Sequence, residues 1–169
     1  MAANRSAGFS LVGTTVVALL VAFAASYSRA GLAAGAWSTL GGNAQHTGVS
    51  TVPAQPLEVV RWSTPVDLAT PGDFILIHYG SPVVTPANTV VIPVKTGASG
   101  GFRVDARSGN NGALIWSATT DYLLPPHGWT PSYSPALTPN NRAYFAGAGG
   151  TVFFRDNVDS SVPTGGRLA

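Results

Sequence analysis

The residues best suited to binding chemistry gather in one aromatic loop that runs from Asp121 to Tyr133. Two adjacent prolines stiffen this loop, and its aromatic rings and imidazole offer the flat and hydrogen-bonding surfaces that line many ligand sites. An earlier loop, Asp67–Gly80, carries an imidazole and a tyrosine at nearly the equivalent place. The predicted ligand-binding residues of the two loops are Tyr122, His127, Trp129, Tyr133, His78 and Tyr79. The alternative interpretation is that these side chains only cover the end of the fold and pack on one another.

No pattern in the sequence is typical of a catalytic or metal site, and we predict neither. The histidines lack His-x-x-x-His spacing, and there is no Ser-His-Asp order or suitably spaced carboxylate pair. The run Gly147–Thr151 lacks the lysine of a phosphate loop and leads into a predicted strand, so it indicates a hairpin turn. Asp156–Asp159 carries several oxygen donors, but their spacing is not that of a calcium loop. Cysteine is absent, which excludes thiolate metal sites, disulfides and a cysteine nucleophile.

The composition favours short strands joined by turns. Charged residues make up 9% of the chain, against about 25% in an ordinary soluble domain, and there are 20 glycines and 13 prolines. One lysine and one glutamate are too few for long helices with a polar face. From Gly31 onward six arginines and one lysine balance six aspartates and one glutamate, which argues against a nucleic-acid partner or an anionic lipid surface.

Residues 1–30 are predicted to be a signal peptide. Arg5 precedes the apolar run 9–25, and Ser28 and Ala30 place small residues where a signal peptidase cleaves before Gly31. A second cleavage site, before Trp37, is also available. We therefore expect an exported protein, periplasmic or extracellular. The alternative is an uncleaved membrane anchor at residues 9–25, which is at the short limit for crossing a bilayer.

An internal repeat determines the predicted fold. Ser81–Asn88 and Ser134–Asn141 are identical at five of eight positions with an offset of 53, and Trp62 and Trp116 are 54 residues apart. A period near 50 with four strands in each unit is typical of a propeller blade. The sequence therefore predicts an all-β fold with about two β-propeller blades of four antiparallel strands. The two tryptophans are predicted to pack between neighbouring blades.

The predicted boundaries place an N-terminal strap at residues 31–56 and a partial propeller at residues 57–169. Within the propeller we expect an orphan outer strand at Leu57–Thr64, a complete blade at residues 80–118 and an incomplete, three-stranded blade at residues 133–159. Asp105 and Asp156 are predicted to accept backbone N–H groups in hairpin turns. Because one complete blade cannot cover its own apolar faces, the following side chains are expected to be partly unburied: Val83, Val91, Val104, Ile115, Phe145 and Phe153.

Two segments carry a resemblance to a known family. Asp105-Ala106-Arg107-Ser108-Gly109, followed by Ala113-Leu114-Ile115-Trp116, resembles the Asp-Ala-x-Thr-Gly-Lys-x-x-Trp ending of PQQ-type repeats, and Trp37–Gly48 resembles the segment that often opens such proteins. The chain is therefore similar to quinoprotein alcohol dehydrogenase-like β-propellers. It departs from them in the longer spacer Gly109–Gly112, in the second copy, which lacks the glycine, and in having no adjacent cysteine pair.

The resemblance implies an exported, non-catalytic propeller with a binding or scaffold role, of which this chain is the N-terminal part. Its partners would be the remaining blades and a protein, peptide or carbohydrate ligand. One alternative is a fragment of a PQQ-dependent dehydrogenase, whose several blades would together hold PQQ and Ca²⁺. Another is a carbohydrate- or peptide-binding module that uses the aromatic loop. No cofactor is evident in this chain alone.

Overall fold

The computed structural model describes residues 35–53, 58–69, 80–97, 100–123, 134–162 and 164–168. The chain divides by internal contacts into Met1–Gly31 and Leu32–Ala169, and all described residues belong to the second unit. The predicted signal peptide therefore lies outside the described residues. Among the described residues the regular elements are eight strands and one 3-10 turn, and no helix there is long and apolar enough to cross a membrane.

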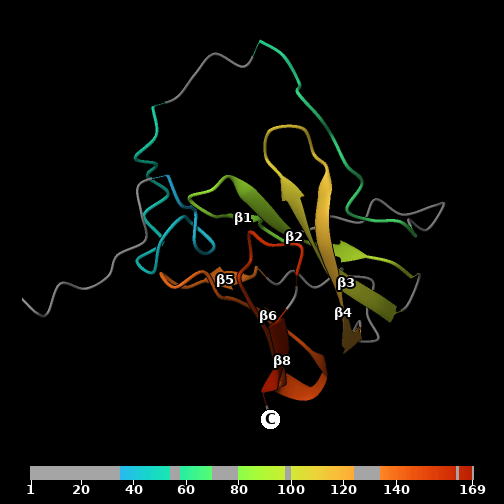
Figure 1. The fold of residues 1–169 in the computed structure, drawn as a ribbon. Helices are drawn as coiled ribbons and strands as arrows, with labels where there is room; N and C mark the ends of the chain where they lie inside the picture. The colour runs from blue at the N-terminus through green and yellow to red at the C-terminus, as the bar shows by residue number, and fades with distance from the viewer. Residues whose placement is uncertain are drawn as a thin grey trace, which may run out of the picture. The chain divides into compact units, whose positions relative to one another are not determined.

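The first sheet is a four-stranded antiparallel meander in the order β1-β2-β3-β4 (Figure 1). It comprises β1 (Val83–Val84), β2 (Thr89–Lys95), β3 (Gly100–Ser108) and β4 (Leu114–Leu123). All four strands begin within residues 80–118, the bounds predicted for the complete blade, and β4 continues five residues beyond them. Short apolar runs form the strands of this meander, and turns rich in proline, asparagine and glycine set where each strand ends.

The second sheet repeats the same meander in the order β5-β6-β7-β8. It comprises β5 (Ala136–Leu137), β6 (Ala143–Ala146), β7 (Val152–Asp156) and β8 (Thr164–Leu168), and the 3-10 turn η1 (Ala148–Gly150) joins β6 to β7. The prediction of an all-β fold is confirmed, and the two sheets are consistent with two propeller-like blades.

Two predicted features of strand content are wrong. The second sheet has a fourth strand, β8, where three strands were expected. Every residue of β8 is exposed and two are glycines, so no apolar alternation marks it; the backbone ladder with β7 holds it in place. The predicted orphan strand Leu57–Thr64 is not a strand over residues 58–64, because no described strand lies beside it to complete a ladder.

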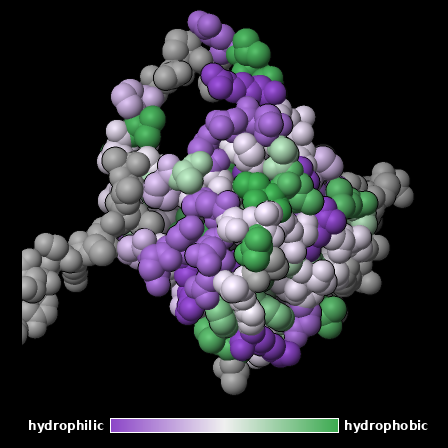
Figure 2. All heavy atoms as spheres, viewed as in Figure 1, coloured by the Kyte–Doolittle hydropathy of each residue, from purple (hydrophilic) through white to green (hydrophobic). Residues whose placement is uncertain are grey.

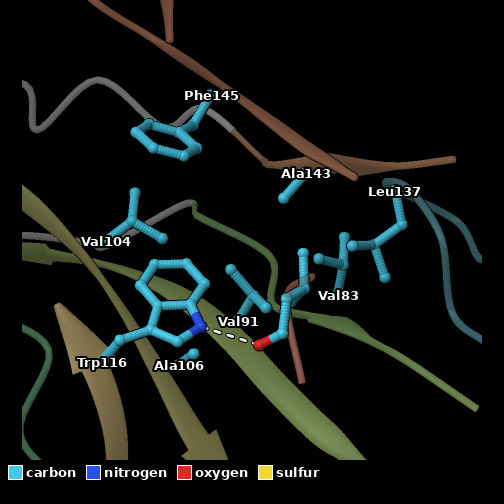
Figure 3. Close-up of a cluster of buried hydrophobic side chains, with 9 residues drawn as sticks. Val83, Val91, Val104, Ala106, Trp116, Leu137, Ala143 and Phe145 are labelled. Carbon is cyan, nitrogen blue, oxygen red and sulfur yellow. Dashed lines mark hydrogen bonds between the residues drawn. The ribbon is translucent and has the colours of Figure 1, made fainter. Parts of the chain in front are cut away.

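The two sheets share one hydrophobic core (Figure 3). Its buried members from the first sheet are Val83, Val91, Val104, Ala106 and Trp116. The second half of the core comes from Leu137, Ala143, Phe145 and Val158. The expectation that the blades would leave these side chains partly unburied is therefore wrong for Val83, Val91, Val104 and Phe145. Each sheet covers one face of the other, and only Ile115 and Phe153 of that predicted set are partly buried.

The strand register shows that opposite faces of the two sheets meet. In the first sheet the row facing the core is Val83, Val91, Ala106 and Trp116. In the second sheet the row that faces the core begins with Leu137 and Ala143. These two residues follow Val84 and Val90 by 53 positions, and that pair lies on the other face of the first sheet. The sheets therefore stack in one direction, front to back.

Candidate functional site

Of the six predicted ligand-binding residues, one belongs to the part of the chain that the structure describes. Tyr122 stands on β4, half-buried, with its ring edge-to-face on Phe102 at 5.2 Å between centroids. Burial raises the pKa of the Tyr122 hydroxyl above its ordinary value. The remaining predicted residues, which are His127, Trp129, Tyr133, His78 and Tyr79, lie outside the described residues. The expectation that the two loops meet on one face stays a prediction.

Trp62 and Trp116 each donate an indole hydrogen bond to a backbone carbonyl in the last turn of a sheet. The indole Nε1 of Trp116 donates to the carbonyl oxygen of Val158, in the turn after β7, at 2.7 Å (Figure 3). The indole Nε1 of Trp62 donates to the carbonyl oxygen of Gly109, in the turn after β3, at 2.9 Å. The prediction that Trp116 packs between the two sheets is confirmed, since it is buried in their shared core. Trp62 makes the equivalent contact with the first sheet.

The turn residue that accepts each indole hydrogen bond is itself bonded to the turn after the first strand of the same sheet. The amide of Gly109 donates to the carbonyl of Asn88 at 2.8 Å, and the amide of Val158 donates to that of Asn141 at 3.3 Å. Both asparagines have left-handed backbone, with φ of 65° and 60°, a conformation that asparagine tolerates better than most residues. A tryptophan, a turn residue and an asparagine are thus linked in the same order in both repeats.

An aspartate repeats with each tryptophan, and the sequence analysis missed it. Asp67 and Asp121 each follow a tryptophan by five positions. Asp67 pairs with Lys95 Nζ at 3.3 Å, and this ammonium, which is fully buried, also donates to the carbonyl of Ala69. Asp121 accepts from the amide of Ala148 at 2.8 Å and pairs with Arg167 at 3.2 Å. The shared Trp-x-x-x-x-Asp spacing was the signal that could have found both.

Asp105 corrects another expectation. It lies within β3, not in a turn, and its side chain is fully buried. Its carboxylate accepts from the Ser117 hydroxyl at 2.7 Å and pairs with Arg103 at 2.8 Å and Arg107 at 3.1 Å. The reason for the error is that β3 continues to Ser108, which moves the turn three residues further along the chain.

The second sheet carries the ion pair Arg142–Asp156 and a second arginine, Arg155, that has no ion-pair partner among the described residues. Asp156 ends β7 and receives two hydrogen bonds from the Arg142 guanidinium, at 2.5 and 2.9 Å. These bonds lower the pKa of the Asp156 carboxyl and raise that of Arg142. Arg155 points into the space between the sheets, stacked 4.2 Å over the Trp116 ring, and its buried Nε and one terminal nitrogen have no hydrogen-bond partner. Burial lowers the pKa of Arg155.

The N-terminal strap ties the first strands of the two sheets together. The backbone N–H and carbonyl of Trp37 exchange hydrogen bonds of 2.9 and 2.8 Å with Val84 in β1. The next carbonyl, that of Ser38, accepts from the amide of Leu137 in β5 at 2.8 Å. A short piece of the strap therefore spans both sheets and holds their first strands at a fixed separation.

The described residues line at least two hollows. The larger, about 400 Å³, is open and is lined by residues 58–62 and Gly109. The smaller, about 180 Å³, lies between the turns that follow β1 and β5. Across the described ranges no three His, Cys, Asp or Glu side chains stand close enough together to hold a metal ion. The sequence analysis predicted neither hollow.

Comparisons of the chain with protein-family models, with curated proteins and with solved structures found no match. The arguments about function below therefore rest on the sequence and the geometry.

Proposed function

We propose that this chain forms two successive blades of an exported, non-catalytic β-propeller of the PQQ-repeat type, with a binding or scaffold role. The observation that carries the proposal is the front-to-back stacking of two equivalent sheets. Successive blades of a propeller meet in this way, since each covers the next around the ring. A two-fold β-sandwich would instead bring equivalent faces together.

The repeated tryptophan contact supports the same assignment. Trp116 lies on β4, the last strand of the first sheet, and its indole donates a hydrogen bond to the third turn of the second sheet. Trp62 reaches the third turn of the first sheet in the same way, which supports the proposal that residues 58–64 would form the last strand of a preceding blade. The contact thus links each unit to the one after it, which is what a ring of blades requires.

The exposure of residues 58–62 supports the remaining blades as a partner in this proposal. Val59 and Val60 are 80% and 81% exposed, in an extended segment without a ladder partner among the described residues, and Figure 2 shows apolar residues exposed on the surface of the molecule. Extended backbone without a ladder partner and exposed apolar side chains are features that bind further strands. The remaining blades would supply the three strands that this segment lacks.

Two measurements test the proposal. N-terminal sequencing of exported protein should give a mature start at Gly31 or Trp37; material that begins at Met1 would refute export. The exported protein at its natural full length should not reduce a redox dye after incubation with PQQ and Ca²⁺. Dye reduction above the rate of a heat-denatured sample would overturn the non-catalytic assignment in favour of a dehydrogenase.

A further inference from the structure

The smaller hollow is built from both copies of the repeat. It lies between the turn Thr85–Asn88 and the turn Thr138–Asn141, each closed by a hydrogen bond from the asparagine amide to the threonine carbonyl. It is found at the end of β5 that leads into β6, whereas the predicted aromatic loop joins the other end of that strand. The lining residues are Thr85, Pro86, Ala87, Leu137, Thr138, Pro139, Asn141 and Asp159.

Asp159 supplies the one charged group in this lining. Four other described carboxylates, those of Asp67, Asp105, Asp121 and Asp156, each form an ion pair with a lysine or an arginine. Asp159 has no such partner among the described residues. Its Oδ1 accepts a hydrogen bond of 2.6 Å from the Thr85 hydroxyl, and its Oδ2 accepts none from the described part of the chain. A half-buried carboxylate without a cation favours a positively charged ligand.

The size and walls of the hollow select the kind of cation. Its volume of about 180 Å³ is roughly six times the share of one water molecule in the liquid, about 30 Å³. A bare Ca²⁺ would need about six to eight oxygen ligands and would find a single carboxylate. Pro86, Ala87, Leu137 and Pro139 instead offer apolar contacts along the walls. The lining fits an ammonium group carried on a short hydrocarbon stem.

We infer that this hollow receives a lysine side chain from a partner protein. An ammonium needs only one carboxylate oxygen, whereas an arginine that bound both oxygens of Asp159 would have to share Oδ1 with the Thr85 hydroxyl, so the site suits an ammonium better. Lys95, the one lysine of the 169 residues, cannot fill this hollow, because it is fully buried against Asp67. A second copy of the chain would bury its lysine in the same way. Both walls belong to the two sheets described, so the site does not depend on ring closure.

Titration calorimetry with Nα-acetyl-lysine-N-methylamide on the full chain tests the inference. Asp159→Asn keeps an oxygen for the Thr85 hydroxyl but removes the charge, and it should weaken binding by roughly tenfold or more, as expected for a charge-assisted hydrogen bond. The matched control is Glu58→Gln, the other described carboxylate without an ion pair, which lines the larger hollow and should leave the affinity unchanged. Equal affinity of the wild type and Asp159→Asn would overturn the inference.

A second ligand and a second variant keep the test decisive. The norleucine analogue has nearly the same stem without the ammonium, and it should bind at least about tenfold more weakly than the lysine compound. Equal binding of the two would refute recognition of the charge. Ala87→Phe fills the hollow from an exposed position and leaves Asp159 in place, so it should abolish binding while the circular dichroism of the sheets is retained. Normal binding by this variant would place the ligand elsewhere and overturn the inference.

Discussion

Replacing Trp116 with phenylalanine tests whether the tryptophan contact joins the two sheets. Trp116 is 5% exposed, and its indole satisfies the carbonyl of Val158 at 2.7 Å. Phenylalanine cannot donate, so a buried acceptor loses its partner at a cost of about 1–3 kcal/mol. The smaller ring also leaves a void in the shared core. Removing an aromatic core side chain completely costs about 3–5 kcal/mol of stability, and we expect the smaller void left by phenylalanine to cost about 1 kcal/mol. We expect a total loss of about 2–4 kcal/mol.

The matched variant is Trp62→Phe. Trp62 donates an equivalent hydrogen bond to Gly109 at 2.9 Å, but the ring is only half-buried and water can reach the carbonyl once the indole is gone. Its loss should cost about 0.5–1.5 kcal/mol. Urea unfolding followed by far-ultraviolet circular dichroism measures both values, with each variant referred to its own folded and unfolded baselines. Equal losses for the two variants, or a loss below about 1 kcal/mol for Trp116→Phe, would refute the argument that this contact holds the sheets together.

Three further variants test other parts of the structure by urea unfolding. Arg155→Met removes two buried nitrogens that lack partners, so stability should stay the same or rise, and a loss above about 1 kcal/mol would contradict this. Arg142 lowers the pKa of the Asp156 carboxyl below its ordinary value of 3.8. The ion pair therefore stabilises the fold above pH 3.8, and this stabilisation is lost as the carboxyl is protonated at lower pH. The Asp156→Asn variant should be less stable than the wild type at about pH 6 and equally stable at about pH 2. Gly112→Ala should cost about 2 kcal/mol, because φ is +74° and the added Cβ would lie 2.9 Å from the Trp62 ring; an unchanged urea midpoint would show that the indole is not held there.

The repeat made the central strands of both sheets predictable from the sequence. Asn88 and Asn141 each end a Thr-Pro-x-Asn turn, and the strand that follows is β2 in the first copy and β6 in the second. The position of Trp116 between the sheets was also predictable, since a large ring recurring once in each repeat has to pack at the joint between repeats. In each case a short local pattern is sufficient, because the turn and the strand it begins lie next to each other in the chain.

The rest depends on neighbours that a local pattern does not specify. Strand β8 contains Gly165 and Gly166, and only its ladder with β7 makes it a strand. Residues 58–64 have the apolar content of a strand but no partner strand among the described residues. The hollow at Asp159 exists because two turns 53 residues apart lie side by side, at a spacing set by the stacking of the sheets. Pattern reasoning therefore found the repeating unit, whereas the contacts between units required the structure.

The two sheets share one backbone plan but differ in the chemistry of their equivalent faces. On the face that the second sheet turns toward the first, Phe145 pairs with Phe153 across β6 and β7. The pair at the same register in the first sheet is Ile92 with Asp105. Asp105 is fully buried between two arginines, so a neighbour covering this face must meet a charged layer where the second sheet offers phenylalanine rings.

Covering such a layer removes water from guanidinium groups that are now partly hydrated, and the cost of that desolvation offsets much of the gain from contact. The joint between the two described sheets, which is apolar and closed by the Trp116 hydrogen bond, has no comparable cost. In a ring of such blades the joint in front of the first sheet would therefore be the weaker one. Residues 58–62, which precede the first sheet, are likewise extended and have no ladder partner among the described residues.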